Sequence, residues 1–338
     1  MSSAAAPRTS LILLACNQAA TVRAAAESCL AQQGEALEIV LSDDASSDDT
    51  YAQLCAVAQA YRGPHLVRAR RNPTNLGIGA HYNRLIEETR GELLVTAAGD
   101  DISLPQRVEH LVAAWRAGGE RAELIASDCI SLAPDGTLGE RIVLDDLALC
   151  SVESWCARRP FTIGATHAFT RRMMQRFGPF VPDLWYEDIV MGLRAIMTGG
   201  ALKVPEALVH YRSGGSSRPM LAASGIELVA RARRQNRRVL AEIEQHTRDA
   251  RLAGFEAQVA AALAPTLARE RYLESMIDAP DKRARWLACV DAAPLPLGWR
   301  LRKFMTFSFP DQVSWIKIAQ ARLRGRRPGW SKPLVRQG

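Results

Sequence analysis

Short apolar runs alternate with amphipathic stretches through the first 127 residues, and this alternation constrains the fold more than any other feature of the chain. Strands are predicted at 10–15, 38–41, 66–69, 93–97 and 124–127. Helices are predicted between the strands, for example at 50–61 and 78–89, because apolar residues recur there at helical spacing. Alternation of this kind builds a mostly parallel sheet with helices on both faces, so the predicted fold class is α/β.

Acidic side chains follow two of the predicted strands. Asp43 comes after strand 38–41, and Gly99-Asp100-Asp101 comes after strand 93–97. In parallel sheets ligands bind outside the carboxyl ends of the strands, so we expect these two loops to meet in one crevice. Aspartates at such positions either shape turns and cap helices, or bind a nucleotide and a divalent cation. The presence of two such loops in this order favours the ligand site.

Two further acids, Glu187 and Asp188, follow an aromatic pair and open a predicted helix. Acids at a helix N-terminus are stabilised by the helix dipole, which is a sufficient structural reason for them. A carboxylate in a partly apolar cleft is also suited to act as a general base toward an acceptor hydroxyl. The Gly/Ser loop at 210–218 has two interpretations as well, because its arginines can bind a phosphate or it can join two regions.

The cysteines and the hydropathy pattern restrict the class of protein. Seven cysteines are present, without CxxC spacing, which indicates reduced thiols and neither a zinc site nor a disulfide framework. No run approaches the roughly 18–20 apolar residues of a membrane-spanning helix, and the N-terminus has no signal-peptide pattern. We therefore expect a cytoplasmic protein. Hydrophobic residues make up 48% of the chain, which excludes a largely disordered one.

Charge divides the chain into two regions. Residues 1–215 hold 20 lysines and arginines against 25 acids, whereas residues 216–338 hold 23 against 11. We expect the first region to be the α/β domain and the second to be a basic helical C-terminal region. Segment 297–327 interleaves cations with aromatic and aliphatic residues, which suits either an anionic membrane surface or a helical cap with a solvated face. No nucleic acid is expected as a partner, because no recognition fold accompanies the charge.

The motifs in this order resemble the family 2 glycosyltransferases, which have the GT-A fold, a Rossmann-like, mostly parallel sheet flanked by helices. The resemblance covers residues 9–215 and depends on the order and spacing of six stretches: 11–17, 38–50, 75–83, 91–95, 99–102 and 187–188. It implies a nucleotide-diphosphate sugar as donor and a saccharide or lipid-linked acceptor. It also implies that the nucleotide is bound by six residues: Cys16, Asn17, Asp43, Asn75, Gly77 and Asp100.

The same resemblance implies roles for the remaining acids. Asp100, with Asp101 beside it, corresponds to the metal-binding end of the family's DxD element and would hold Mg²⁺ or Mn²⁺. Asp188 corresponds to the catalytic base and Glu187 to its neighbour, so that transfer inverts the anomeric configuration. Ala98 stands where the family has the first DxD aspartate, which puts strict metal dependence in question. This departure also supports an alternative, a catalytically silent scaffold module with the same fold at the membrane.

Other departures bear on the mode of action. The QxxRW signature and the downstream membrane helices of the processive polysaccharide synthases are missing, so we expect one sugar per turnover. Ala15 and Cys16 stand where the family often has a proline and a tyrosine in its first loop. The expected role is therefore an inverting transferase in the synthesis of cell-surface polysaccharide or glycan.

Overall fold

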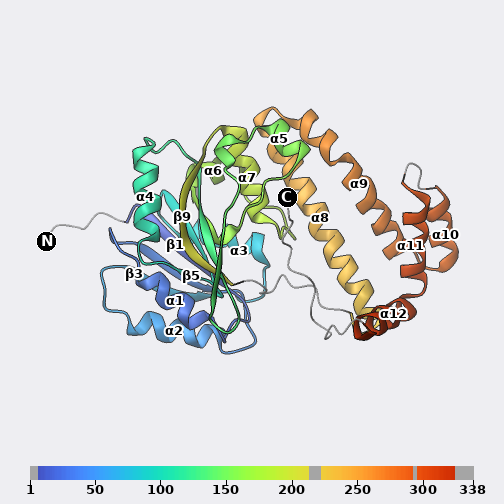
Figure 1. Ribbon diagram of the computed structural model, residues 1–338, viewed down its shortest axis with the longest axis horizontal. Helices are drawn as coiled ribbons and strands as arrows, with labels where there is room; N and C mark the ends of the chain where they lie inside the picture. Colours follow the sequence, from blue (N-terminus) through green and yellow to red (C-terminus); the bar gives the residue numbers. More distant parts are fainter. Residues whose placement is uncertain (1–6, 213–221, 292–294, 324–338) are drawn as a thin grey trace. The chain divides into compact units, whose positions relative to one another are not determined.

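The computed structural model describes residues 7–212, 222–291 and 295–323. The structure contains a nine-stranded sheet with helices on both sides (Figure 1). Eight of the strands lie in the order β3-β2-β1-β4-β8-β6-β9-β5, and β7 pairs with β6. The strands of this sheet are β1 (Thr9–Ala15), β2 (Glu38–Asp43), β3 (Leu66–Arg71), β4 (Leu93–Ala98), β5 (Ile102–Ser103), β6 (Leu124–Leu132), β7 (Leu138–Ile142), β8 (His167–Thr170) and β9 (Ala201–Arg212).

The first four strands of the spatial order are parallel. β1 lies between β2 and β4, and β3 pairs with the outer side of β2. All seven residues of β1 are buried, as expected for a strand that is covered on both faces. β8 then pairs antiparallel with both β4 and β6, and β6 is again parallel to β9. The predicted α/β fold is confirmed, and the five strands predicted from the apolar runs are all present.

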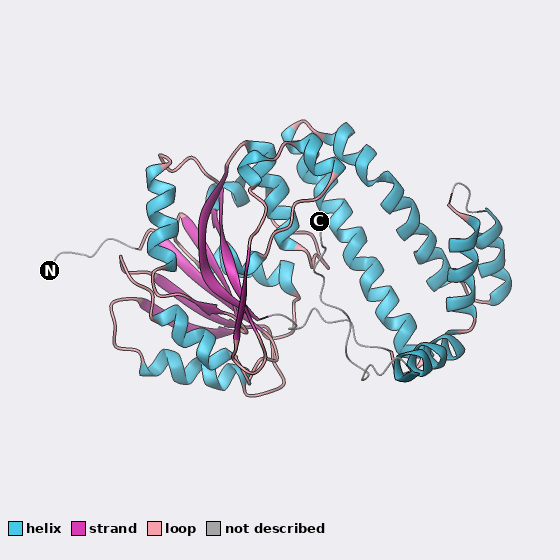
Figure 2. Cartoon of the chain, in the orientation of Figure 1, coloured by secondary structure: helices cyan, strands magenta, loops and turns pink. Residues whose placement is uncertain are grey.

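Helices cover the sheet on both faces (Figure 2). Those in the first 200 residues are α1 (Val22–Leu30), α2 (Thr50–Ala60), α3 (Ile78–Glu88), α4 (Arg107–Ala117), α5 (Val152–Ala157), α6 (Arg171–Phe177) and α7 (Glu187–Thr198). One hydrophobic core cluster includes Leu11, Leu13, Ile39, Leu41 and Val95 from the parallel strands. At roughly 25 cal/mol per Å² of apolar surface, burial of these side chains holds the strand ends in a fixed arrangement.

The chain divides into two compact units. The first consists of Met1–Ser213 with Glu244–Val259, and the second of Gly214–Ile243 with Ala260–Gly338. The long helix α8 (Gly225–Ala253) contributes residues to both units. The second unit is otherwise built from α9 (Glu256–Asp278), α10 (Lys282–Asp291), α11 (Leu297–Ser308) and α12 (Pro310–Leu323), around a small core that contains Tyr272, Met276 and Phe307. No helix in the described ranges is both long and apolar enough to cross a membrane.

Candidate active site

The carboxyl ends of β1, β2 and β4 meet at one edge of the sheet. The register places Ala15 opposite Asp43 and Leu14 opposite Ala98, so the loops that follow the three strands start side by side. The Asp43 loop and the Gly99-Asp100-Asp101 loop therefore flank the loop that follows β1. This is the arrangement that the order of the strands predicts for a ligand site in a parallel sheet.

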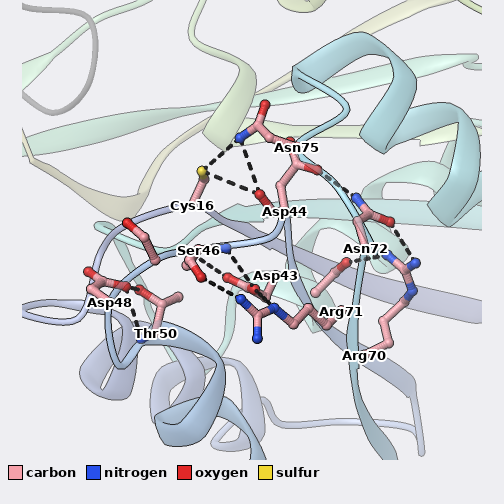
Figure 3. Close-up of polar contacts among 12 residues, drawn as sticks. Cys16, Asp43, Asp44, Ser46, Asp48, Thr50, Arg70, Arg71, Asn72 and Asn75 are labelled. Carbon is pink, nitrogen blue, oxygen red and sulfur yellow. Dashed lines mark hydrogen bonds and ion pairs between the residues drawn. The ribbon is translucent and has the colours of Figure 1, made fainter.

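Asp43 is fully buried at the end of β2. Its carboxylate accepts hydrogen bonds from the backbone N–H of Ser46, at 3.0 Å, and from the Ser46 hydroxyl. The guanidinium of Arg71 pairs with the same carboxylate, with Nε 3.1 Å from Oδ2. Figure 3 shows these partners around Asp43. In the ligand-free protein Asp43 therefore organises the loop, and a direct contact with a nucleotide requires it to exchange one of these partners.

The neighbouring Asp44 joins two loops that are far apart in the sequence. Its Oδ1 accepts from Asn72 Nδ2 at 2.7 Å and from the N–H of Leu76 at 2.8 Å, and its Oδ2 accepts from the N–H of Gly77 at 3.0 Å. Gly77 needs φ = +77°, a conformation that favours glycine, at the start of α3. The sequence analysis did not single out Asp44, although an acid directly after a strand was the signal that identified Asp43.

Cys16, Asn17 and Asn75 lie together at this edge. Asn75 Nδ2 lies 3.1 Å from Cys16 Sγ and 3.2 Å from the carbonyl oxygen of Asp44 (Figure 3). Asn17 has φ = +52°, and its Oδ1 accepts from the N–H of Ser47 at 2.9 Å. Burial, followed by the charge of Asp44, raises the pKa of the Cys16 thiol, so the thiol is neutral. These partly exposed polar groups form one wall of the candidate site.

Gln18 links this wall to the Asp100 loop. Its Oε1 accepts from the N–H of Cys16 at 3.2 Å, and its side chain also hydrogen-bonds to Asp100. The hydroxyl of Thr21 donates to the carbonyl of Gly99 at 2.9 Å. A side chain at position 99 would clash with Gln18, and its Cβ would lie 2.9 Å from Ala15 Cβ, so the close approach requires glycine. Gln18 therefore connects the loop of Cys16, which Asn75 contacts, to the loop of Asp100.

Asp100 and Asp101 are held in surroundings that disfavour their charge. Burial raises the pKa of Asp100. Burial, followed by the charge of Asp100, raises the pKa of Asp101 to about 8. Asp101 Oδ1 accepts from the N–H of Arg212 at 2.7 Å, and Arg212 Nε donates to the carbonyl of Asp100 at 3.0 Å. Arg212 at the end of β9 is thus tied to the loop. Residues 213–218 of the predicted Gly/Ser loop lie outside the described residues.

Two buried polar side chains lie beneath these acids and were not predicted. Arg107 has no exposed surface, and it donates to Ser103 Oγ at 2.9 Å and to the carbonyl of Ala165 at 2.7 Å. Burial lowers its pKa to about 10, although the charge of Asp101 opposes this shift. Burial, followed by the charge of Arg107, lowers the pKa of His167 to about 3. Neither ring nitrogen of His167 has a hydrogen-bond partner in the described part of the chain.

Glu187 and Asp188 form the first turn of α7. Burial, followed by the charge of Asp188, raises the pKa of Glu187 well above its usual range. A Cβ at Gly164 would lie 2.8 Å from Glu187 Oε1 and 3.3 Å from Asp188 Cβ, so this glycine lies directly against the two acids. The predicted helix start at these acids agrees with the bounds of α7.

One aromatic ring connects the acids of the two predicted groups. Burial, then the charges of Asp101, Asp100 and Asp188, raise the pKa of the Tyr211 phenol to about 12. The charges of all three carboxylates therefore act on the phenol of Tyr211, which comes from β9 and was not predicted as a site residue. β4 and the start of α7 both contact Gly164, since its carbonyl accepts from Thr96 Oγ1 at 2.6 Å and a Cβ at this glycine would lie 3.3 Å from Asp188 Cβ.

Asp100 and Asp101 suit a divalent cation in the number and type of ligands that they offer. Mg²⁺ and Mn²⁺ are bound by one or two carboxylates when a diphosphate and water supply the other ligands. Asp100 and Asp101 supply two adjacent carboxylates, and their raised pKa values mean that added positive charge would favour their ionised forms. In the described ranges no group of three or more His, Cys, Asp or Glu side chains is placed to hold a metal by itself. A cation at this point would therefore depend on the donor's phosphates.

The fold and this site define the GT-A class of nucleotide-sugar-binding folds, and comparisons with known proteins agree. Residues 10–136, which include β1 to β6, match the family described as Glycosyl transferase family 2. In these residues the chain is therefore similar to the family 2 glycosyltransferases. The fold is similar to that of S. aureus TarS 1–349 in complex with UDP-GlcNAc, with a TM-score of 0.53, 14% identity and coverage of 94% of this chain and 92% of TarS.

Two curated relatives match about a third of this chain. The chain is 32% identical over 109 residues to EpsE of Bacillus subtilis (strain 168), named as a glycosyltransferase, covering 32% of this chain and 38% of EpsE. It is 31% identical over 126 residues to the succinoglycan biosynthesis protein ExoO of Rhizobium meliloti (strain 1021), covering 37% of this chain and 35% of ExoO. The chain thus spans little more than a third of the length of either relative.

Proposed function

We propose that this chain is an inverting glycosyltransferase that moves a sugar from a nucleotide-diphosphate sugar to a saccharide or glycolipid acceptor. The observation that carries the proposal is that β4 and the start of α7 both contact Gly164, while the charges of Asp100, Asp101 and Asp188 all act on Tyr211. This arrangement supports two roles near one another, a phosphate-side site at the loop after β4 and a proton acceptor at the start of α7. The match to the family model supports the same reaction class.

The donor would lie along the edge of the sheet. Cys16, Asn17 and Asn75 offer partly exposed polar groups for the nucleoside, and Gly77 opens α3 toward the diphosphate. Asp43 would act on the base or ribose through the loop that it orders, or directly after exchanging the Ser46 hydroxyl. Asp100 and Asp101 would hold a divalent cation, which when bound supplies positive charge to offset the charge of the departing diphosphate.

The acceptor would be activated by Asp188. Because burial disfavours the charged form of Glu187, we propose Asp188 as the member of the pair that accepts the proton, with Glu187 as its neighbour. The acceptor oxygen attacks the anomeric carbon on the face opposite the leaving diphosphate, and its proton passes to Asp188. Attack from the opposite face inverts the configuration. One such base contributes on the order of 10²–10⁴-fold, so positioning supplies the rest.

The names of the relatives suggest the setting. ExoO is named for succinoglycan biosynthesis, and we propose that this chain likewise acts in the synthesis of a cell-surface polysaccharide or glycan. We also propose a cytoplasmic location, since all seven cysteines are free thiols, as is usual in a reducing compartment. A glycolipid acceptor would be presented at a membrane surface.

Two observations favour a second candidate, a scaffold module without catalysis. Ala98 replaces the first DxD aspartate, and Asp43 is fully engaged with the chain's own residues. Such a module would bind a nucleotide-sugar or a partner without consuming the donor. The two candidates differ in one observable, the breakdown of the donor, because a transferase slowly passes its sugar to water when no acceptor is present.

A two-part experiment tests the proposal. Purified full-length chain is first heated with UDP, GDP or dTDP, with and without Mn²⁺, and one nucleotide should raise the melting temperature because it binds only the folded chain. The matching nucleotide-sugars are then incubated with the chain, and release of the nucleoside diphosphate is measured. Binding with release supports the transferase, and binding without release supports the scaffold. Neither binding nor release of any donor would reject both.

A further inference from the structure

The second unit exposes large apolar side chains on two neighbouring helices. On α10, Trp286, Leu287 and Val290 are spaced so that they share one face, and each is between 48% and 55% exposed. The exposed Arg283 lies on the same face, one turn before Trp286. Large apolar residues at helical spacing normally face a core, so a solvent-facing stripe of this kind indicates a binding surface.

A second stripe lies on α11. Leu297, Leu301 and Met305 follow one another at intervals of four residues, and they are 36% to 58% exposed. The other side of α11 packs inward, since Phe307 is buried in the core of the unit and Trp299 and Phe304 pack against that core. The helix therefore has an apolar side that its own unit already uses and a second apolar stripe that the described residues leave exposed.

The two stripes belong to helices that are packed against each other. The rings of Trp286 on α10 and Phe304 on α11 lie 5.4 Å apart, edge to face. Arg300 on α11 donates to the carbonyls of Cys289 and Val290 at the end of α10, at 2.7 and 2.9 Å. α10 and α11 run side by side in Figure 1. We call the six residues Trp286, Leu287, Val290, Leu297, Leu301 and Met305 the α10–α11 surface.

Three cations of α11 and α12 act on one another next to this surface. Burial, then the charges of Arg302 and Lys317, lower the pKa of Lys303, while Glu270 opposes the shift. Lys303 Nζ also lies 5.5 Å from the centre of the Trp299 ring. Arg302 is exposed on the turn that carries Leu301, and Lys317 comes from α12. Three cations that repel one another at the edge of an apolar stripe are arranged to accept anions.

We propose that the α10–α11 surface, with Arg302, Lys303 and Lys317, binds an anionic lipid bilayer. Apolar side chains would enter the boundary between headgroups and acyl chains, Trp286 would lie at headgroup level, and the cations would meet lipid phosphates. A second copy of the chain fits less well, because a two-fold interface would bring the two cation groups toward each other. A nucleic acid would leave the exposed aliphatic side chains without a partner.

The residues that could contact a membrane are not those that the sequence of segment 297–327 suggests. Trp299, Phe304 and Phe307 pack toward the unit's own core, whereas Leu297, Leu301 and Met305 face outward and residues of α10 join them. Residues 324–327 of that segment lie outside the described residues. The inference goes beyond sugar transfer and does not depend on it, since vesicle binding and donor breakdown are separate measurements.

The test is co-sedimentation of the full chain with two kinds of vesicle, phosphatidylcholine alone and phosphatidylcholine with an equal part of phosphatidylglycerol. Binding to the anionic vesicles at low salt is expected, with little binding to the neutral ones and a decrease at high salt. The variant Arg302→Gln/Lys317→Gln should bind about fivefold more weakly for each cation removed. The variant Leu301→Gln/Met305→Gln should lose most of the binding that persists at high salt.

Matched controls come from the first unit. Leu149→Gln replaces an aliphatic residue that is 85% exposed, and Arg23→Gln/Arg90→Gln removes two exposed cations, and neither variant should change vesicle binding. Circular dichroism checks that each variant is folded. Three results would overturn the proposal: no binding to anionic vesicles, equal loss in the control variants, or a dimer in light scattering that the Leu301→Gln/Met305→Gln variant dissociates. Binding to an oligonucleotide in preference to the vesicles would overturn it as well.

Discussion

The guanidinium of Arg194 on α7 is held by the carboxylate of Asp249 on α8, with Nε 2.6 Å from Oδ2 and Nη2 3.2 Å from Oδ1, and both side chains are fully buried. Gln245 supports this pair, since its Nε2 donates to Asp249 Oδ1 at 2.8 Å and its Oε1 accepts from the N–H of Val181 at 2.7 Å. The helix that begins with the proposed catalytic acids is thus fixed at a point two turns into its length.

Replacing Asp249 by Ala is expected to destabilise the chain strongly. The variant leaves the buried Arg194 without its counter-charge, and breaking a buried pair in this way costs about 3–5 kcal/mol. Urea unfolding of the first unit measures the loss. Glu256→Ala, which removes an exposed partner of Arg251, is the control and should change the midpoint little. Equal losses in the two variants would contradict the proposed support of α7.

Asp188→Asn is expected to abolish sugar transfer while leaving donor binding intact. The amide cannot take a proton, so the rate should fall by about 10²–10⁴-fold, and the affinity for the nucleotide should stay within about twofold. Glu187→Gln removes a carboxyl whose charged form burial already disfavours, so it should lower the rate less. Single-turnover assays with calorimetric binding measure both quantities. Full activity of Asp188→Asn would remove this residue from the mechanism.

Gly164→Ala is expected to slow sugar transfer without lowering the affinity for the donor. The new methyl would lie 2.8 Å from Glu187 Oε1 and 3.3 Å from Asp188 Cβ, so the acids must shift by a few tenths of an ångström. Displacements of this size near reacting atoms can cost on the order of tenfold or more in rate. Gly192→Ala on α7 is the matched control, since its methyl would meet only Leu147 at 3.5 Å. A rate unchanged in Gly164→Ala would argue against the acid pair.

Asp44→Asn is expected to weaken both folding and nucleotide binding. The carboxylate of Asp44 accepts hydrogen bonds from Asn72, Leu76 and Gly77. In the variant, the NH₂ group of the asparagine side chain would take the place of one carboxylate oxygen and would face a donor instead of accepting from it. We expect a loss of about 1–3 kcal/mol in stability. Nucleotide affinity should fall about tenfold, because the loop that carries Asn75 and Gly77 loses its support. Asp49→Asn at the exposed start of α2 serves as the control.

His167 is expected to make the folded chain sensitive to acid. Its pKa falls from 6.5 to about 3 in the folded state, so the unfolded chain binds more protons between these values. The stabilisation is complete above pH 6.5 and is lost as the pH falls toward 3. At pH 5 the loss relative to pH 7 is on the order of 2 kcal/mol.

The variant His167→Leu isolates this effect. Its unfolding free energy should fall less than that of the parent chain between pH 7 and pH 5, because the titrating group is gone. Phe169→Leu, a neighbouring core substitution on β8 without a titrating group, should lower stability by the same amount at both pH values. Parallel pH profiles for the parent chain and His167→Leu would show that His167 does not contribute.

Parts of the candidate site were predictable because the signal for them is local. An acid directly after a buried strand, as at Asp43 and Asp100, lies at the ligand edge of any parallel sheet. The acids at 187–188 mark a helix start by local electrostatics. Other members left no such signal. Gln18 lies in the loop after β1, Arg107 begins α4 and Tyr211 lies in β9, and no local pattern marks any of the three as a neighbour of the acids.

The sequence by itself determined the layered α/β architecture, the strand ends that form the site and the uneven charge of the two regions, because periodicity, turn chemistry and charge are properties of neighbouring residues. Only the tertiary structure decided that Asp43 is engaged by Arg71, that Asp44 joins two loops, and that α11 turns Leu301 outward while Phe307 is buried. These outcomes depend on contacts between residues distant along the chain, and burial then sets which carboxylates and histidines carry charge.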